Sequence, residues 1–449
     1  MFIPHTDTDR EEMLRKIGIN SIDDLFMDVP SAYRFPDLDL PPALTEMEVV
    51  ADLEDLALGN QSVRDLTCFL GAGAYYHYIP AAVDQILRRG EFYTAYTPYQ
   101  PEISQGTLRA IFDYQSLITA LTGMDVSNAS HYDGATASAE AVTLAYAQFR
   151  GKRNKIILSP ALHPQYRQVI RTYNHGSSLQ FVGDEGSIDL QAGPEALYPL
   201  LDGQTALVIV QYPDFFGRIY DLTALADAVH AVGALLSVSV NPLSLGLLTP
   251  PGDFGADIVT GEGQTLGIPL SYGGPYLGIF ATRQQYVRKM AGRLVGETID
   301  TNGQRAYVLT LTAREQHIRR EKATSNICTN QGLMALASTV YMSLLGKNGL
   351  RQVAELCYQK AHYAANRIGK LPGFELWTKT PFFNEFIVRC PKPVAEINED
   401  LLDYDILGGY DLGQDYAELE NCMLIAVTEM IPKEEIDVLV DVLSEASDD

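Results

Sequence analysis

The stretch Gly255-Ala-Asp-Ile-Val-Thr-Gly-Glu-Gly-Gln-Thr-Leu-Gly-Ile-Pro-Leu-Ser-Tyr-Gly-Gly-Pro275 decides the fold of this chain. It begins with an apolar run over residues 256–260, continues as a glycine-rich loop, and leads into a second apolar run over residues 276–281. Short, continuous apolar runs bounded by glycine are typical of strands that are buried on both faces. In α/β proteins, ligands bind at the loops beyond the carboxyl ends of such strands. The stretch therefore predicts a strand, a ligand-facing loop and a second strand.

Further candidate strands precede this stretch, with helical patterns between several of them. These strands cover residues 155–159, 179–182, 205–211 and 234–240. Alternating strands and helices predict a mostly parallel sheet with crossover helices. The strand signal ends after Met290, and the last part of the chain predicts a smaller α+β unit. The expected domains are an N-terminal arm (1–60), a large α/β domain (61–330) and a small C-terminal α+β domain (331–449).

Size, charge and composition exclude several classes of function. The 449 residues exceed one compact core, so we expect more than one domain. The 33 basic and 57 acidic side chains give a net charge of −24, which argues against nucleic acid and anionic membranes as partners. No apolar run has the length of a membrane span and the N-terminus lacks a signal-peptide pattern, so we expect a cytoplasmic location. The five cysteines and eight histidines are dispersed without metal-ligand spacing, so we predict no metal site.

Residues 1–60 have the pattern of an arm. Ser21 followed by Asp24 predicts a helix start with a capping box. A second helical pattern covers residues 45–60, beyond a proline-rich segment. Such an arm either wraps a partner subunit or lies on the surface of its own chain.

Two segments carry the residue types of a small-molecule site. Residues 92–106 combine aromatic rings, prolines and small polar groups, which either line a ligand pocket or pack as an aromatic turn under a helix. Residues 128–147 begin as a turn of small residues and continue as a helix. Free backbone N–H groups of Gly134, Ala135 and Thr136 at this helix start are suited to bind phosphate. Small residues there also permit close packing, which is the alternative interpretation.

Three further positions have both a functional and a structural interpretation. His163 and the loop over residues 212–217 each follow a predicted strand, at the ligand end of the sheet. A helix-start histidine with an ordinary structural role is the alternative. Residues 314–330 form either a solvated helix face or a contact for an anion or a subunit. The basic side chains of this segment are Arg314, Arg319, Arg320 and Lys322.

The expected outline is that of pyridoxal-phosphate-dependent transferases of the aspartate-aminotransferase type (fold type I), an α/β fold with a large mixed-sheet domain and a smaller C-terminal α+β domain. Such enzymes need a lysine for the Schiff base, an acid beside the pyridine nitrogen, and phosphate donors. Gln264 stands in the expected lysine position and Ser239 in the acid position, and no lysine occurs between Lys155 and Lys289. An amide forms no imine, and a serine supplies no charge. Either the remote Lys322 replaces the missing lysine, or the chain is not catalytic by itself.

Four motifs resemble those of one protein family. They are Tyr96-Thr-Pro-Tyr-Gln-Pro-Glu-Ile-Ser-Gln-Gly106, Asn128-Ala-Ser130 with Ala135-Thr-Ala137, Gln211-Tyr-Pro-Asp-Phe-Phe-Gly217 and Arg314-Glu-Gln-His-Ile-Arg-Arg-Glu-Lys-Ala-Thr-Ser-Asn-Ile-Cys-Thr329. Over essentially its whole length, the chain resembles the P-protein of the glycine cleavage system. Within that family it looks like the separate N-terminal (alpha) subunit of the two-subunit bacterial form. The motif that ends at Thr329 is long and specific, far beyond a short pattern match.

The resemblance implies an activity that two subunits share. In that family, glycine is decarboxylated on pyridoxal phosphate, and the remaining aminomethyl group passes to the lipoyl arm of the H-protein. The family's alpha subunit has lost the cofactor lysine, whereas the beta subunit carries the lysine and the cofactor. The active site lies near the alpha–beta interface of an α2β2 heterotetramer. We therefore expect the lysine-free subunit of an aminomethyl-transferring glycine dehydrogenase, inactive alone.

The same resemblance implies roles for individual residues, with packing at the subunit interface as the alternative for each. The residues expected to line the shared cavity are Tyr96, Thr97, Tyr99, Glu102 and Ser104. The expected polar contacts across the interface are Thr324, Ser325 and Asn326. The expected border of the cavity mouth is Gly71, Gly73 and His77. The expected remnant of a phosphate site is Gly134, Ala135 and Thr136.

Overall fold

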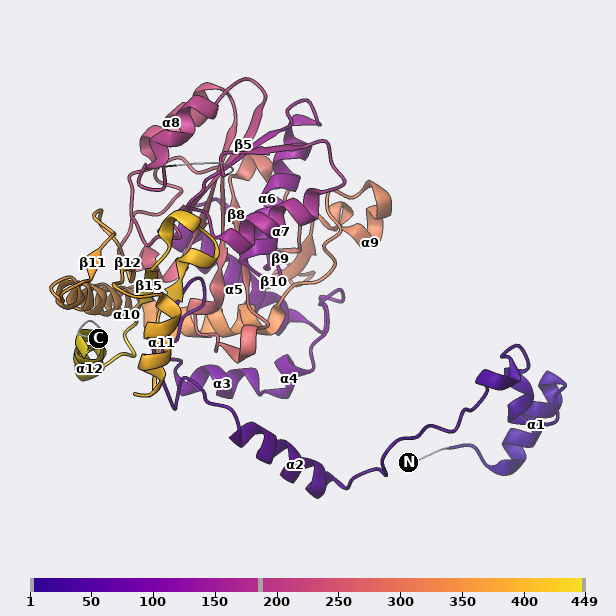
Figure 1. Cartoon of the computed structure of the whole chain (residues 1–449). Helices are drawn as coiled ribbons and strands as arrows, with labels where there is room; N and C mark the ends of the chain where they lie inside the picture. The colour runs from indigo at the N-terminus through magenta and orange to yellow at the C-terminus, as the bar shows by residue number, and fades with distance from the viewer. Residues whose placement is uncertain (1–3, 185–188, 446–449) are drawn as a thin grey trace. The chain divides into compact units, whose positions relative to one another are not determined.

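The computed structural model describes residues 4–184 and 189–445 and divides into two compact units, Met1–Gln61 and Ser62–Asp449 (Figure 1). The first unit consists of short helices joined by extended segments. These helices are α1 (Asp7–Ile17), the 3-10 helices η1 (Ile22–Phe26) and η2 (Ser31–Tyr33), and α2 (Glu46–Leu58). None of them buries a side chain. The capping box predicted at Ser21 is confirmed, because Ser21 and Asp24 exchange side chain–backbone hydrogen bonds.

A seven-stranded sheet forms the centre of the second unit. Its strands, in spatial order, are β2 (Val126–Ser127), β8 (Gly278–Thr282), β7 (Ile258–Glu262), β6 (Leu235–Val240), β5 (Thr205–Tyr212), β3 (Lys155–Leu158) and β4 (Gln180–Val182). Strands β4, β3, β5, β6 and β7 are parallel, whereas β8 runs antiparallel to β7 and to β2. The prediction of a mostly parallel sheet is confirmed, and the reversal at β8 makes the sheet mixed.

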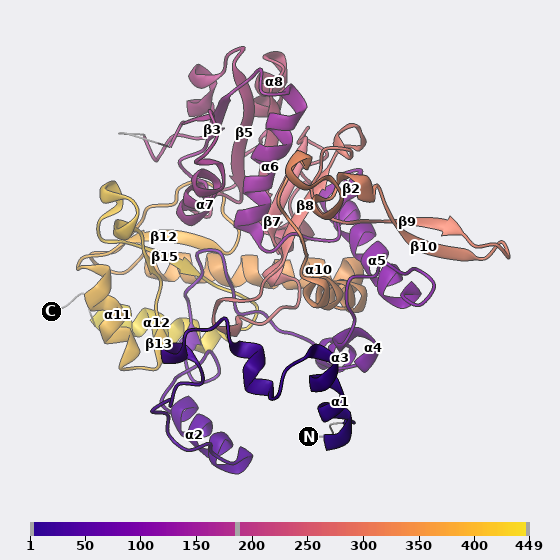
Figure 2. The ribbon, with the colours of Figure 1, turned by 90° about the vertical axis from the view of Figure 1, so that its right-hand side faces the viewer.

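Helices cover both faces of this sheet (Figure 2). Neighbouring residues of β5 point to opposite faces, as the strand geometry requires. Val208 and Val210 pack into one apolar core, and Leu207 and Ile209 pack into the other. The first core also takes side chains from α5 (Gln105–Thr122), α8 (Thr223–Ala231) and the first half of α10 (Gly332–Ile368). The second core takes side chains from α6 (Gly134–Phe149) and α7 (Pro164–Asn174). Among the described residues, no helix is long and apolar enough to cross a bilayer.

The C-terminal part of the second unit has its own sheet and core. This antiparallel sheet contains, in spatial order, β11 (Glu375–Leu376), β12 (Glu385–Arg389), β15 (Cys422–Ala426) and β14 (Tyr410–Asp411). Its core includes side chains from α11 (Val394–Leu402), from α12 (Lys433–Glu445) and from the second half of α10. Helix α10 therefore contributes to two cores, and its backbone is interrupted at Gly346, with φ 59°.

A segment close to the start of the second unit packs into this C-terminal core. Strand β1 (Thr67–Cys68) pairs in parallel with β13 (Ile406–Leu407), and the adjacent Phe69 is a fully buried member of the core. The short helices α3 (Ala81–Leu87) and α4 (Gly90–Tyr93) follow. Residues far apart in the sequence thus build one structural part.

A hairpin of two strands was not predicted. Strands β9 (Leu294–Ile299) and β10 (Arg305–Thr310) form an antiparallel hairpin after Met290, where the expected strand signal ended. The strands are short and half polar, so they lack the continuous apolar run used to find the buried strands. Gln105 fastens the hairpin to α5, because its side chain accepts from Tyr307 N at 2.9 Å and donates to Tyr307 O at 2.8 Å.

Candidate functional site

The loop after β7 holds Gln264 in the protein interior. The short turn η5 (Gly263–Thr265) follows β7 directly, and Gln264 is 1% exposed. Its Oε1 accepts the N–H of Tyr75 at 2.9 Å, and its Nε2 donates to the carbonyls of Tyr75 at 2.9 Å and Ile268 at 2.8 Å. The amide therefore joins two backbone segments that are far apart in the sequence. An ammonium group has no acceptor, so a lysine cannot make the bond to Tyr75 N–H.

Glu262 directs its carboxyl group at three backbone N–H groups close to the start of α6. Oε2 accepts from Gly134 N at 2.9 Å, and Oε1 accepts from Leu277 N at 2.9 Å and from Gln264 N at 3.1 Å. Burial raises the pKa of Glu262 to about 8, against the opposing effect of these N–H donors. A helix start that binds phosphate needs its N–H groups free. Here a side chain of the same chain takes one of them.

The other predicted phosphate donors are also partly engaged. Thr136 N donates to Asp133 Oδ1 at 2.7 Å in the capping box of α6. The expectation of free N–H groups is therefore wrong for Gly134 and Thr136. At Gly134, an added Cβ would lie 2.4 Å from the Tyr166 hydroxyl oxygen and 2.9 Å from Glu262 N. Close packing, the alternative interpretation of the small residues, thus holds at this position.

The pocket beside Ser239 and Glu262 is small. Ser239, on β6, and Glu262 line a pocket of about 30 Å³ together with side chains from other segments. The pocket's other side chains include Tyr75, His163, Tyr166 and Gln211. Small-molecule sites enclose roughly 300–1,000 Å³, and a volume near 30 Å³ holds about one water molecule. Pyridoxal phosphate does not fit this small pocket, because its volume is far below that of a small-molecule site and the N–H groups of Gly134 and Thr136 are engaged.

His163 lies at this pocket, at the ligand end of the sheet as expected. Its ring stacks on Tyr166, with centroids 4.9 Å apart. Nδ1 accepts from Gln165 N at 3.2 Å and Nε2 donates to Ala72 O at 2.9 Å, which is the arrangement of a neutral ring. Burial lowers the pKa of His163 to about 4. The histidine thus helps to fill the pocket and also caps α7.

Gly71, Gly73 and His77 do not border one common opening. Gly73 lines the pocket of about 30 Å³. A Cβ on Gly71 would lie 2.4 Å from the Ala426 Cβ, so Gly71 packs closely against β15. His77 pairs instead with Glu429, with 2.7 Å between Nδ1 and Oε2. The three residues therefore fasten one segment at three separate places.

Tyr96 and Thr97 line a second, larger pocket of about 340 Å³. Its other walls include Pro275, the last residue of the stretch that opened the sequence analysis, and residues 329–336. The Tyr96 side chain is 84% exposed, so this pocket lies at the protein surface. Of the other expected cavity residues, Glu102 is exposed and Ser104 is the residue before α5, and neither lines this pocket.

Tyr99 joins the aromatic loop to the basic segment through Arg293. The guanidinium of Arg293 lies 5.7 Å from the Tyr99 ring centroid and donates to the Tyr99 hydroxyl at 3.2 Å. The same side chain lies 3.8 Å from the Glu315 carboxylate, and the His317 ring lies edge-on to Tyr99 at 5.4 Å. The structure thus brings together two motifs that were singled out separately. Arg293 itself was not predicted.

Thr324, Ser325 and Asn326 line a third pocket, of about 400 Å³, together with Thr136. The Ser325 hydroxyl donates to Glu140 Oε1 at 2.6 Å. Burial raises the pKa of Glu140 to about 7, against the effect of this bond. Among the described residues, Glu140 Oε2 has no hydrogen-bond partner. The sequence analysis missed Glu140, although a single glutamate among the alanines of α6 was a signal. It also missed Glu262, a carboxylate within the glycine loop.

Comparison with solved structures first defines the class of protein. A glutamate decarboxylase from Lactobacillus brevis superposes with a TM-score of 0.69 at 13% identity, over 93% of this chain and 96% of that chain. At such low identity the likeness shows the fold alone. The chain has the fold of pyridoxal-phosphate-dependent enzymes of fold type I, as expected.

Closer relatives define the family. The family description "Glycine cleavage system P-protein" matches residues 1–443. A protein from Thermomicrobium roseum named "Probable glycine dehydrogenase (decarboxylating) subunit 1" is 56% identical over 447 residues, which cover 100% of both chains. A solved structure of glycine decarboxylase (P-protein) of the glycine cleavage system, in inhibitor-bound form, superposes with a TM-score of 0.89 at 41% identity over 99% of both chains. The chain belongs to the glycine cleavage system P-protein family, as the four sequence motifs predicted.

Proposed function

We propose that this chain is the cofactor-free alpha subunit of a glycine decarboxylase. A beta subunit carries the lysine and the pyridoxal phosphate, and the two chains form an α2β2 heterotetramer. The assembly decarboxylates glycine and transfers the aminomethyl group to the lipoyl arm of the H-protein. The name "subunit 1" of the relative from Thermomicrobium roseum supports the two-chain arrangement.

The observation that carries the proposal is the small pocket beside Glu262 and Ser239. Gln264 clamps backbone there, Glu262 takes the N–H of Gly134, and the remaining volume is about 30 Å³. A fold-type-I chain without room for the cofactor beside these residues is expected to contribute to catalysis through a neighbouring chain. The alpha chain thus supplies surface and position rather than the reacting group.

The alpha chain's contribution is proposed to come from its two larger pockets. Tyr96 and Thr97 line one of them, and Thr324, Ser325 and Asn326 line the other. Exposed aromatic rings and hydroxyl groups suit a surface that closes over a small polar substrate in a partner chain. Tyr99, through Arg293, holds the aromatic loop and the basic segment in a fixed arrangement.

The test compares the chain alone with the chain plus a lysine-bearing partner. Alone, in the presence of pyridoxal phosphate, the chain is expected to show no visible absorbance band of a lysine-bound cofactor. It is also expected to show no exchange of CO₂ into the carboxyl group of glycine. The mixture with the partner is expected to show both. A stable band in the isolated chain, fixed to a lysine by borohydride, would falsify the proposal.

A self-sufficient enzyme that uses Lys322 is the first alternative. Lys322 is exposed, in the short turn η9 (Arg320–Lys322), and is not among the residues that line the small pocket. The absorbance spectrum of the isolated chain with pyridoxal phosphate tests this alternative. A band of a lysine-bound cofactor would support it, and the absence of the band would exclude it. A non-catalytic scaffold protein is the second alternative. It predicts that the partner's exchange activity is the same with and without this chain.

A further inference from the structure

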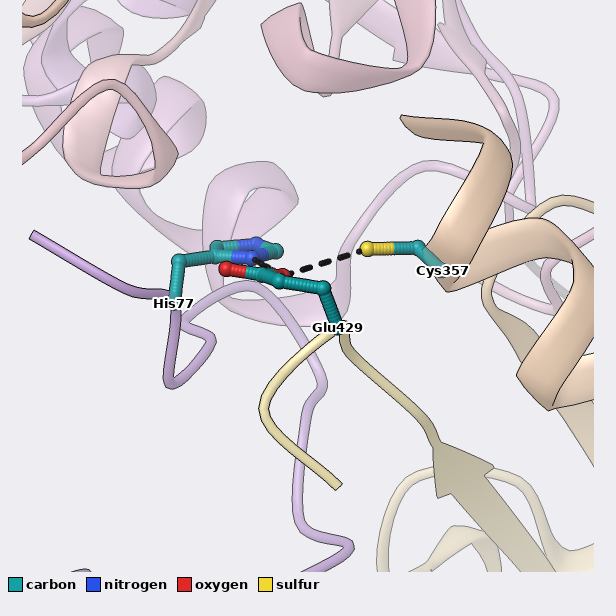
Figure 3. A group of neighbouring side chains, drawn as sticks. All are labelled: His77, Cys357 and Glu429. Carbon is teal, nitrogen blue, oxygen red and sulfur yellow. Dashed lines mark hydrogen bonds and ion pairs between the residues drawn. The ribbon is translucent and has the colours of Figure 1, made fainter. Parts of the chain in front are cut away.

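Three side chains that can bind a metal converge beneath the surface of the second unit, away from the pockets described above (Figure 3). His77 comes from the segment before α3, Cys357 from α10, and Glu429 from the segment after β15. One ligand atom of each lies within 4.8 Å of the others. The His77 Nδ1 is 2.7 Å from Glu429 Oε2, and the Cys357 Sγ is 3.4 Å from the same oxygen. No spacing in the sequence predicts this convergence, because the three residues are far apart along the chain.

The Glu429 carboxylate is held in a fixed orientation. Its Oε1 accepts the N–H of Tyr78 at 2.7 Å, which leaves Oε2 directed at His77 and Cys357. Lys360 donates to the backbone carbonyl of Glu429 at 2.6 Å and so fixes the chain behind the carboxylate. Outer hydrogen bonds of this kind orient the ligands of metal sites.

Charge also favours a divalent cation at this place. His77 and Cys357 are buried, with 5% and 0% of their surfaces exposed. A divalent cation would neutralise one thiolate and one carboxylate and leave no net charge in the interior.

The donor set indicates which cation. Imidazole nitrogen, thiolate sulfur and carboxylate oxygen together suit Zn²⁺ rather than Mg²⁺ or Ca²⁺, which prefer oxygen ligands only. With bonds of 2.0–2.3 Å, tetrahedral zinc ligands stand roughly 3.3–3.8 Å apart. The His77–Glu429 contact therefore opens by less than about 1 Å on binding. A buried hydroxyl on Tyr341, close enough to interact electrostatically with Glu429 and Cys357, has no hydrogen-bond partner among the described residues.

We propose that His77, Cys357 and Glu429 form a structural zinc site that fastens the segment before α3 and the segment after β15 to helix α10. Zinc takes the place of the Cys357 thiol proton, which leaves to solvent, and it binds Nδ1 of the neutral His77 ring, whose one N–H proton then lies on Nε2. A water or the Tyr341 hydroxyl completes the four ligands. The inference does not rest on the proposed function, because it concerns the stability of this chain and not its partner.

The experiment uses the full chain with the exposed Cys328 replaced by serine, so that this surface thiol does not bind metal. The chain is treated with a chelator, and Zn²⁺ alone is then titrated in a calorimeter. We expect one Zn²⁺ per chain, proton release, and a rise in the thermal unfolding midpoint. Co²⁺ in place of Zn²⁺ is expected to give the near-ultraviolet charge-transfer absorption of a thiolate ligand.

The Cys357→Ser substitution is expected to weaken Zn²⁺ binding at least about 100-fold, because even outer partners of metal ligands contribute 10–100-fold. Cys390→Ser is the matched control, since Cys390 is also a buried thiol but lies outside the cluster. This control is expected to bind as the parent does. Equal Zn²⁺ binding by the Cys357→Ser variant and the parent would overturn the proposal. If that variant fails to fold, the Co²⁺ spectrum of the parent chain tests the proposal. A Co²⁺–thiolate band supports the metal site, and its absence would show that the three residues form a hydrogen-bonded cluster only.

Discussion

At the scale of single residues, Gln264 is a structural clamp. Its side chain makes three hydrogen bonds to the backbone of Tyr75 and Ile268. Gln264→Lys is expected to lower the free energy of unfolding by about 2–5 kcal/mol, because it leaves the Tyr75 N–H unpaired and buries an ammonium group. Urea denaturation measures this change. The variant is also expected to gain no glycine decarboxylation on its own, since Ser239 still supplies no charge and Glu262 still takes the Gly134 N–H.

The control for this prediction is Gln284→Lys. Gln284 is exposed, and an exposed substitution changes the free energy of unfolding by only about 0.5 kcal/mol or less. Equal stabilities of the two variants would show that the Gln264 clamp contributes nothing. Decarboxylation by Gln264→Lys in the absence of any partner chain would show that the small pocket does admit the cofactor.

Glu262 makes the stability of the chain depend on pH. Its folded pKa of about 8 lies above that of a free glutamate, so the folded state binds more protons than the unfolded state between about pH 4.5 and pH 8. The contribution of Glu262 to stability is therefore greatest below this range and is lost as pH rises through it. The slope for one proton is at most about 1.4 kcal/mol per pH unit. Glu262→Gln is expected to flatten the plot of unfolding free energy against pH.

The matched control for Glu262 is Glu418→Gln. Glu418 is exposed, so this substitution is expected to leave the slope unchanged. Each variant is compared by its slope rather than its absolute stability, because Glu262→Gln also alters the bonds to Gly134 N and Leu277 N. An unchanged slope in Glu262→Gln would mean that its folded pKa lies near the ordinary value.

At the scale of elements, a substitution in the aromatic loop over residues 92–106 is expected to lower activity without lowering stability. Tyr96 is 84% exposed and lines the pocket of about 340 Å³. Tyr96→Ala is expected to change the free energy of unfolding by about 0.5 kcal/mol or less. In the complex with its partner, the same variant is expected to lose at least about tenfold in the rate of glycine–CO₂ exchange. This loss corresponds to about 1.4 kcal/mol of transition-state stabilisation.

Tyr404→Ala is the control for the loop, because Tyr404 is also exposed but lies outside this pocket. It is expected to keep full exchange activity in the complex. If Tyr96→Ala is as active as Tyr404→Ala, the loop is an aromatic turn with a packing role, which is the alternative interpretation of its sequence.

At the scale of the whole molecule, the first unit is expected to serve assembly rather than folding. The residues of the large apolar cores all come from positions after Gln61, and the described helices of the first unit bury no side chain. Deletion of residues 1–61 is expected to leave the thermal unfolding of the second unit almost unchanged. The same deletion is expected to weaken association with the partner chain. It removes exposed apolar side chains, such as Leu56 and Leu58, which are expected to be buried against the partner.

Sedimentation of the mixed chains measures this association, and circular dichroism checks the fold of the shortened chain. Equal association of the full and shortened chains would identify residues 1–61 as a surface arm without a role in assembly. That outcome would leave the proposal of a partner chain, which rests on the small pocket beside Glu262, unchanged.

Much of the fold was predictable because it depends on local patterns. Apolar runs predicted β3 to β8, since strands buried on both faces consist largely of apolar residues. The hairpin of β9 and β10 was missed because its strands are half exposed and held by the side chain of Gln105, from a distant helix. The contribution of Phe69 to the C-terminal core was also missed, because it depends on contacts with residues that are far away in the sequence.

The sequence by itself determined the chemical limits of Gln264 and Ser239, because no fold gives an amide the reactivity of an amine or a serine the charge of an acid. Only the tertiary structure decided which partners surround these residues. Glu262 lies 128 positions from Gly134, and Tyr75 lies 189 positions from Gln264, yet each pair is hydrogen-bonded. Such contacts depend on side-chain geometry after the sheet has formed, which no local pattern encodes.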